Sequence, residues 1–207
     1  MKFANKKIYF FVKSLLDRFI ALFLLITISP FLVLIALLIR IILKNPIFFI
    51  QQRPGYKCRI FNLIKFRSMN NGKDESGNLL PDNLRISNFG NFLRSYSIDE
   101  LPQLINIIKG ELSFVGPRPL LVKYLPLYSS KQIKRHNVKP GLTGWASVNG
   151  RNSISWEEKF QLDIWYVENQ SFFLDINILF VTFIKVFRRE GINASSSLTM
   201  EEFKGNN

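Results

Sequence analysis

Two adjacent carboxylates, Asp99 and Glu100, are the side chains in this sequence whose types best suit catalysis. Basic residues from three other segments, Lys65, Arg94 and Arg118, can bind phosphate groups. Arg118 is distinctive because the prolines on both sides of it restrict the backbone that presents its side chain. A guanidinium held in this way suits the planar recognition of phosphate. These residues together indicate chemistry on a phosphate group.

The common phosphate-binding motifs are absent from the sequence. It contains no Walker A loop, no Gly-x-Gly-x-x-Gly fingerprint and no Asp-x-Asp pair. The remaining way to manage phosphate is a set of arginines together with a Mg²⁺ ion held by carboxylates, for which Asp99 and Glu100 are the candidates. One cysteine and one histidine exclude a disulfide framework and a Cys/His zinc site.

The helix that presents the two carboxylates has two possible starts. A capping box ending at Glu100 would place Pro102 at the fifth helical position, where its missing N–H costs a hydrogen bond. An Asp99 cap places Pro102 at the third position, where no bond is lost. We therefore expect Asp99 to cap a helix over residues 101–109 that ends at Gly110. A helix start favours carboxylate and phosphate, although spacing alone also fits a cap with no other role.

The charge of the chain is concentrated in its first third. Of 28 Lys and Arg residues in 207, thirteen lie in residues 1–73 beside a single acidic residue, whereas residues 74–207 hold fifteen basic and fourteen acidic residues. The net charge of +13 accompanies 47% apolar residues, which excludes a disordered chain. A basic segment suits nucleic acid or anionic lipid, and its neighbours must decide between them.

The neighbours of the basic residues favour a membrane. Residues 19–39 carry no charge over 21 positions, which is long enough for a helix to cross a bilayer. Basic residues flank this run on both sides, and Ser29-Pro30 at its centre predicts a sharp kink. We expect a re-entrant helix that returns to the cytoplasmic face; an ordinary kinked span is the alternative. No small-residue cleavage site follows the run, which argues against a signal peptide.

The predicted fold class is α+β and mostly α, with the re-entrant membrane helix in residues 1–44 and a cytoplasmic helical domain in residues 45–207. A short β-hairpin is expected from residues 47–51 and 57–66, followed by a polar surface loop over residues 70–83. Further helices are expected over residues 87–94, 130–136, 156–167 and 172–189. The last of these has the pattern of a helix lying on an anionic interface, and a core helix is an equal alternative.

Several blocks of the sequence, taken together, resemble one protein family along nearly the whole chain. The chain is similar to the bacterial monotopic phosphoglycosyl transferases, also called bacterial sugar transferases, in their small catalytic form. The matching blocks are the basic start with Ser29-Pro30, Gln52-Arg53-Pro54-Gly55, Lys65-Phe66-Arg67-Ser68-Met69, Leu93-Arg94-Ser95, Asp99-Glu100-Leu101-Pro102-Gln103-Leu104, Gly116-Pro117-Arg118-Pro119, Pro140-Gly141-Leu142-Thr143-Gly144-Trp145 and Asn149-Gly150-Arg151.

The resemblance implies transfer of a sugar 1-phosphate from a UDP-sugar to undecaprenyl phosphate, with Mg²⁺ required and UMP released. It makes Asp99 the nucleophile that forms an aspartyl phosphosugar, and it gives Glu100 either Mg²⁺ binding or proton transfer. Lys65, Arg94 and Arg118 are expected to contact phosphate. The resemblance places the protein at the bacterial inner membrane as a monotopic enzyme with its catalytic domain on the cytoplasmic face. Glycosyltransferases acting downstream are the expected partner enzymes, and the oligomeric state is left open.

The sugar is less closely defined than the reaction. Residues 149–156 and the tail over residues 202–206 resemble the N,N′-diacetylbacillosamine phosphate transferases of bacterial protein N-glycosylation. This favours UDP-N,N′-diacetylbacillosamine as the donor. Another UDP-linked N-acetylated amino sugar, or a UDP-hexose for capsule or O-antigen, remains the alternative.

Other residues receive weaker assignments. Tyr166, like Trp145, suits either stacking on uracil or a place in the core. Asp163, in a helix that matches the family, is expected to support the site by pairing with an arginine. His136 is expected to be a packed or surface residue, and Cys58 a strand residue. Two other function classes remain: a nucleic-acid binder, disfavoured because the charge surrounds an apolar run, and a non-catalytic membrane scaffold.

Overall fold

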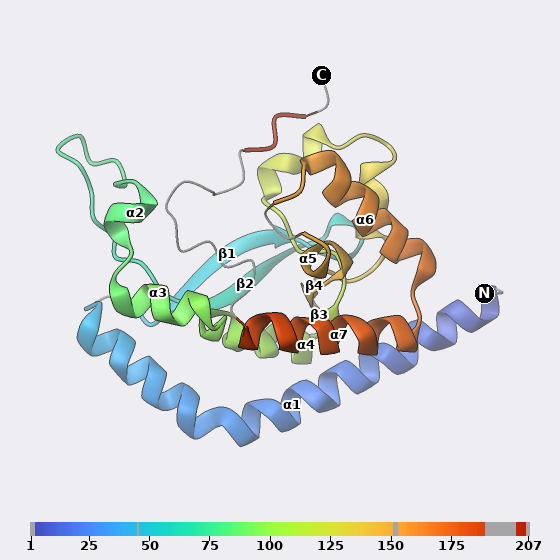
Figure 1. The fold of residues 1–207 in the computed structure, drawn as a ribbon, viewed down its shortest axis with the longest axis horizontal. Coiled ribbons are helices and arrows are strands. Elements are labelled where there is room, and N and C mark those ends of the chain that lie inside the picture. The colour runs from blue at the N-terminus through green and yellow to red at the C-terminus, as the bar shows by residue number, and fades with distance from the viewer. Residues whose placement is uncertain (1–2, 45, 151–152, 189–201, 206–207) are drawn as a thin grey trace.

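The computed structural model describes the chain except for residues 1–2, 45, 151–152, 189–201 and 206–207. It is an α+β protein that is mostly helical, as predicted. The described strands form two small sheets of two strands each, and helices make up most of the remaining regular structure. Figure 1 shows a long bent helix along one side of the molecule, with the rest of the chain inside the bend.

The long helix α1 spans Phe3–Ile42 and contains Pro30. Its bend lies near its middle (Figure 1), and the Ser29 hydroxyl donates to the carbonyl oxygen of Ile26 at 2.8 Å. Pro30 has no N–H to donate and crowds the carbonyl of Ile26. The Ser29 hydroxyl therefore satisfies the Ile26 carbonyl oxygen, which loses its helical hydrogen bond at the kink. The predicted kink is confirmed.

Both arms of α1 pack against the same body. The arm before the bend contributes Ala21, which packs with Phe61 and Ile107 in one apolar cluster. The arm after the bend contributes Ile39, which packs with Leu93 in another. Because each arm contacts the rest of the chain, both ends of α1 lie on the same side of its bend.

The outer face of α1 is apolar and exposed. The segment Lys7–Ile42 is long and apolar enough to cross a membrane, and only 11% of its most apolar window is buried inside the protein. Phe11, Phe23 and Ile26 are all more than 60% exposed. An apolar helical surface of this extent indicates contact with lipid.

The predicted hairpin is present. Strand β1, Phe48–Pro54, pairs antiparallel with β2, Ile60–Phe66, and Phe48 lies opposite Phe66. The second strand begins later than predicted, because the turn forms a short 3-10 helix, η1, over Tyr56–Cys58. Lys57 and Cys58 in this turn have positive φ angles of 51° and 60°. Such angles are incompatible with a strand, so the prediction that Cys58 is a strand residue was wrong.

Four short helical elements lie between the end of the predicted polar loop and the second sheet. Helix α3 is capped by Ser87, whose hydroxyl accepts from the N–H of Gly90 at 3.0 Å, and α4 ends at Gly110, which has a φ of 81°. Both boundaries agree with the predicted helices, because short polar side chains and glycine have local reasons to be there. The elements are α2, Asp82–Arg85; α3, Asn88–Ser95; η2, Ile98–Gln103; and α4, Leu104–Lys109.

The predicted Asp99 cap was wrong. The chain turns at Ser97, which has a left-handed φ of 55°, and then runs through the 3-10 helix η2 before α4 begins. Asp99 therefore lies inside the first turn of η2, and the residue is only 8% exposed. The α-helical cap geometry on which the prediction rested does not form here, since the turn follows the tighter 3-10 pattern.

The remaining elements include the second sheet, in which β3 and β4 are parallel. The predicted helix over residues 130–136 is instead the 3-10 helix η4, whose period of three places both Gln132 and Arg135 in the interior. The elements are β3, Ser113–Val115; η3, Val122–Leu127; η4, Gln132–Asn137; β4, Gly141–Thr143; α5, Trp145–Val148; α6, Trp156–Asn169; and α7, Phe172–Phe187.

Helix α7 has two different faces. Asp175 and Ile178 are buried against the domain, whereas Phe173 and Phe187 are 87% and 80% exposed. The first turn of α7 meets the N-terminal arm of α1, where the rings of Tyr9 and Phe172 lie edge to face with centroids 4.9 Å apart. An exposed aromatic face beside a lipid-facing helix favours the interfacial interpretation of α7 over the core interpretation. The predicted C-terminal end at residue 189 lies outside the described residues.

Candidate active site

A cavity of about 510 Å³ contains Asp99 and Glu100 in its wall. Segments far apart in the sequence line it: the hairpin, the loop after it, α3, η2, the loop that carries Arg118, α5 and α6. Three acidic side chains line it, including Asp163. The basic side chains in its wall outnumber them: Arg53, Lys65, Arg67, Arg85, Arg94, Arg118 and Lys159. This charge suits a substrate that carries several phosphate charges.

Glu100 is held by two cations. Lys65 Nζ and Arg118 Nη2 each lie 2.6 Å from the same oxygen, Glu100 Oε1. Burial alone would raise the pKa of Glu100, but the charges of Arg118 and Lys65 outweigh it and hold the pKa well below its usual range. Glu100 therefore stays ionised and fixes the positions of both cations.

Asp99 has a different environment. Within the described residues its carboxylate forms no hydrogen bond or ion pair, and it lies beside the charge of Glu100. Burial, reinforced by the Glu100 charge, raises the pKa of Asp99 to about 6, although Lys65, Arg94 and Arg118 oppose the shift. A carboxylate that is poorly solvated and unpaired is more nucleophilic than one held by cations. Two adjacent carboxylates thus have distinct chemical characters.

The backbone that presents Arg118 is held by two other arginines. Arg135 Nη2 donates to the carbonyl oxygen of Arg118 at 2.7 Å, and Arg53 Nη1 donates to that of Pro119 at 3.2 Å. Two residues before Arg118, a Cβ atom at Gly116 would lie 2.4 Å from the carbonyl oxygen of Lys139, so only glycine allows the two backbone segments to approach this closely. The loop is fixed by these contacts in addition to its prolines.

Asp163 pairs with an arginine of the site region. Arg135 Nε and Nη2 lie 3.1 and 2.7 Å from Asp163 Oδ2, and both side chains are almost fully buried. The pair connects helix α6 to the Arg118 loop, because the Nη2 atom of Arg135 also reaches the Arg118 carbonyl. Asp163 also lines the cavity, where it lies close to the charge of Lys159.

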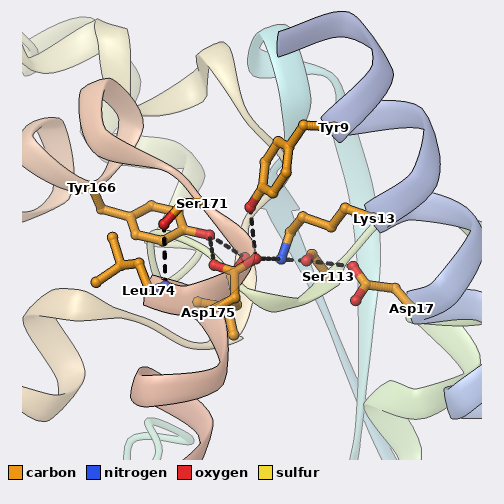
Figure 2. Close-up of polar contacts among 9 residues, drawn as sticks. Tyr9, Lys13, Asp17, Ser113, Tyr166, Ser171, Leu174 and Asp175 are labelled. Atoms are coloured by element: carbon orange, nitrogen blue, oxygen red, sulfur yellow. Dashed lines mark hydrogen bonds and ion pairs between the residues drawn. The ribbon is translucent and has the colours of Figure 1, made fainter. Parts of the chain in front are cut away.

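The structure does not bring Tyr166 to the cavity. Its hydroxyl lies 2.6 Å from Asp175 Oδ1 and 3.1 Å from the carbonyl oxygen of Val115, in the interior between α6, α7 and β3 (Figure 2). Of the two places considered for Tyr166, contact with the uracil of the substrate and the core, the structure shows the core, and this corrects its assignment to substrate binding. Trp145 stacks on Trp165 with ring centroids 5.0 Å apart and does not line the cavity either. Both aromatics serve packing because hydrophobic area dominates their placement.

His136 is a packed residue. It is 4% exposed, its Nδ1 lies 3.1 Å from the carbonyl oxygen of Gly55, and its buried Nε2 has no hydrogen-bond partner among the described residues. Burial and the charge of Arg135 lower its pKa to about 4. It does not line the cavity.

Sequence reasoning missed five basic residues that the structure places in or beside the cavity: Arg53, Arg67, Arg85, Arg135 and Lys159. Arg53 had a signal, since it belongs to the Gln-Arg-Pro-Gly block that carried the resemblance. Arg135 lies in a run of basic residues, where nothing distinguishes a buried guanidinium from a solvated one. Lys159 precedes Asp163 by one helical turn on α6, a spacing typical of an ordinary surface ion pair.

Comparisons with known proteins identify the family to which the chain belongs. The family model described as bacterial sugar transferase matches residues 8–189. The chain is 53% identical over 194 residues to the "Uncharacterized sugar transferase EpsL" of Bacillus subtilis (strain 168), covering 94% of this chain and 96% of that one. The chain therefore belongs to the bacterial sugar transferase family.

Two longer relatives carry more specific names. The "UDP-glucose:undecaprenyl-phosphate glucose-1-phosphate transferase" of Xanthomonas campestris pv. campestris is 37% identical over 190 residues, which is 86% of this chain and 39% of that one. The "UDP-galactose-lipid carrier transferase" of Erwinia amylovora is 36% identical over 198 residues, covering 87% and 41%. The chain thus spans about two fifths of each of these proteins.

Proposed function

We propose that the protein transfers a sugar 1-phosphate from a UDP-sugar to undecaprenyl phosphate and releases UMP. Membership of the sugar transferase family and the names of the two longer relatives support this reaction class. The observation that carries the proposal is the contrast between the two carboxylates. Asp99 has no hydrogen-bond or ion-pair partner among the described residues and has a raised pKa, while Glu100 is held by Lys65 and Arg118 in a cavity rich in positive charge.

The proposed reaction has two displacements at one phosphorus. An oxygen of Asp99 attacks the β-phosphorus of the UDP-sugar, and the bond from that phosphorus to the bridging oxygen breaks, so UMP leaves with the electron pair. The phosphate oxygen of undecaprenyl phosphate then attacks the same phosphorus. The bond to Asp99 breaks and regenerates its carboxylate, leaving a sugar diphosphate on the lipid.

The cationic side chains lower the barrier for charges that repel each other. Arg118 and Lys65 are fixed by Glu100, so their positive charge is already in place when negative charge develops on the phosphoryl oxygens. Arg94, at the last turn of α3, acts on Asp99 through its charge. The low pKa of Glu100 favours a role as a fixed anion over proton transfer.

The donor set is compatible with Mg²⁺ shared between protein and substrate. Among the described residues no group of three or more His, Cys, Asp or Glu side chains could hold a metal. Both cations bind Oε1 of Glu100, which leaves its Oε2 and the Asp99 oxygens for a hard cation that phosphate oxygens also bind. Asp99 and Glu100 would hold the ion, and it would neutralise diphosphate charge.

The membrane arrangement that we propose is monotopic. Both arms of α1 pack on the same body, and its outer face is apolar, as in a helix that enters one leaflet and returns. The exposed face of α7 would lie in the same interface. The catalytic domain would then face the cytoplasm, where UDP-sugars are found and where basic residues at both ends of α1 are retained.

The donor that we favour is UDP-N,N′-diacetylbacillosamine, on the resemblance of residues 149–156 and 202–206. The names of the longer relatives make UDP-glucose and UDP-galactose the principal alternatives. A panel of donors must therefore include both classes of sugar.

The test is UMP release by detergent-purified protein from these three UDP-sugars and UDP-N-acetylglucosamine, with Mg²⁺ and with or without undecaprenyl phosphate. Incubation without acceptor, followed by peptide mass spectrometry, should find one donor's sugar phosphate on Asp99. The Asp99→Asn variant should give neither product, and Asp74→Asn on the exposed loop serves as the matched control. UMP release by the Asp99→Asn variant would contradict the role of Asp99 as nucleophile. No UMP release with any donor would favour a non-catalytic membrane scaffold.

A further inference from the structure

A second cavity, of about 450 Å³, lies between the first turns of α1 and the catalytic domain. It shares no lining residue with the cavity that contains Asp99. Its wall is formed by α1 on one side and by the hairpin turn, β3, the loop before β4 and the end of α6 on the other. The reaction proposed above uses none of these residues.

The charge in this cavity is predominantly positive. Lys7, Lys13 and Lys139 line it, with Asp17 as the acidic residue among them. Asp17 is 8% exposed and accepts from the Ser113 hydroxyl at 2.6 Å, so its charge is partly satisfied inside the protein. The cavity can therefore accommodate an anion.

The three lysines differ in how far they are engaged. Lys13 Nζ contacts Asp175, which also accepts from the hydroxyl of Tyr9 at 2.7 Å, so Lys13 belongs to the junction of α1 and α7 (Figure 2). Lys139 Nζ donates to the neutral Ser14 hydroxyl at 2.7 Å, and its charge lies near the positive charges of Arg18 and Lys13 as well as the negative charge of Asp17, so the cations around it outnumber the one carboxylate. Lys7 is exposed at the edge of the cavity. Lys7 and Lys139 are the cations that an incoming anion can engage.

The same cavity opens onto an apolar surface. Phe10 and Phe11 line it and are 38% and 71% exposed, and Ile8 on the same helix is 63% exposed. Lysines beside exposed aromatic and aliphatic side chains match a molecule with an anionic head and hydrocarbon chains. A free phosphate ion would use only the lysines.

We propose that this cavity binds the headgroup phosphate of one anionic phospholipid per chain. Lys7 and Lys139 contact the phosphate, and the acyl chains lie along Phe10 and Phe11 on the outer face of α1. The site rests on the proposed membrane placement of α1 and adds to it a discrete lipid position. The bound lipid fills the space between α1 and the catalytic domain. Next to this space, the ion pair between Lys13 and Asp175 joins α1 to the domain directly.

The test is native mass spectrometry of the full chain in detergent, titrated with phosphatidylglycerol and, separately, with phosphatidylcholine. We expect one phosphatidylglycerol to bind per chain at concentrations where phosphatidylcholine does not. Lys7→Gln/Lys139→Gln should weaken that binding about tenfold or more, because two cations near the lipid phosphate are lost. Lys44→Gln/Lys109→Gln removes the same charge from exposed positions outside the cavity and should bind like the wild type.

Other results would overturn the proposal. Equal weakening in both double variants would mean general surface attraction, and equal binding of phosphatidylcholine would mean that no anion is selected. One-for-one displacement by undecaprenyl phosphate would make this a position for the acceptor. Full competition by sn-glycerol 3-phosphate would mean that the acyl chains contribute nothing.

Two controls separate this site from the proposals on which it rests. Flotation of the wild type with phosphatidylcholine vesicles tests membrane placement, and a protein that does not float fails at that earlier step. UMP release in detergent should be unchanged in Lys7→Gln/Lys139→Gln, which shows that the variant is folded. If the Lys139 change unfolds the chain, Lys7→Gln alone should weaken lipid binding, since that exposed side chain can be changed without disturbing packing.

Discussion

The carboxylate of Asp163 and the guanidinium of Arg135 form a buried pair, with Asp163 Oδ2 only 2.7 Å from Arg135 Nη2. The same nitrogen lies 2.7 Å from the carbonyl oxygen of Arg118. Helix α6 is thereby connected to the loop that presents a cation to Glu100. Through Arg135, Asp163 thus helps to position Arg118, although Asp163 itself has no contact with the reacting atoms in the proposed reaction.

Asp163→Asn should therefore affect both stability and catalysis. A buried guanidinium without its counter-ion should lower the free energy of unfolding by about 3 kcal/mol. Loosening of the Arg118 loop should lower kcat/KM by about tenfold, mainly through a higher KM for the donor, because Arg118 contacts phosphate before and during transfer. Denaturant unfolding and steady-state UMP release measure the two effects.

The control is Glu157→Gln, on the exposed side of α6, which should change neither quantity. If Asp163 served stability alone, KM for the donor would be unaltered in Asp163→Asn at temperatures where the variant is folded.

Neutralising the two site carboxylates should change stability in opposite directions. At pH 7 a carboxylate with a raised pKa is ionised at a cost, so Asp99→Asn should stabilise the fold by on the order of 1 kcal/mol or more. Glu100→Gln should destabilise it by about 3 kcal/mol, because Lys65 and Arg118 lose the charge that they share. Thermal unfolding of both variants tests this. Destabilisation by Asp99→Asn would mean that its carboxylate has a partner that stabilises the charge.

His136 should make the protein less stable as the pH falls. Its pKa is about 4 in the folded protein and about 6.5 in an unfolded chain, so between these values the unfolded chain binds a proton that the folded one does not. Stability is complete above pH 6.5 and decreases towards pH 4, by at most about 3 kcal/mol from this residue. In His136→Asn the amide can still donate to Gly55, and the difference in pH dependence isolates the histidine. Identical profiles for the two proteins between pH 4 and 6.5 would contradict the prediction.

Straightening α1 should disturb its topology. Pro30→Leu restores a helical N–H, and a straight helix of 40 residues would be about 60 Å long, too long for both arms to pack on one body. In spheroplasts of a Cys58→Ala background, cysteines introduced at Lys7 and Lys44 should both be protected from an impermeant reagent. The Pro30→Leu variant should expose one of them. Opposite accessibility of the two positions in the parent protein would show that α1 spans the membrane.

The elements that the sequence predicted well have local causes. The kink follows from Ser29-Pro30, the start of α3 from the Ser87 hydroxyl, and the end of α4 from Gly110. The mistaken elements lack such causes. Ser97 and Cys58 have positive φ angles of 55° and 60°, and neither residue type favours such a conformation, so the local sequence does not predict it.

The residue types at the site were also visible in the sequence. Asp99, Glu100, Lys65, Arg94 and Arg118 stand in segments whose composition indicates phosphate chemistry, and the structure brings all five to one cavity. The sequence by itself determined which groups are available there. It did so because phosphate chemistry needs carboxylates and fixed cations, which few side chains provide.

Only the tertiary structure decided how those groups are partnered. Lys65 and Arg118 come from segments more than fifty residues apart, yet they meet at one oxygen of Glu100, and Asp99 is left without an ion-pair partner in the part of the chain that the structure describes. The burial of Arg135 and the placement of Tyr166 outside the cavity that contains Asp99 are also tertiary effects. Ion pairing and desolvation depend on distances between side chains that are remote in sequence, and these distances set the chemical difference between two adjacent carboxylates.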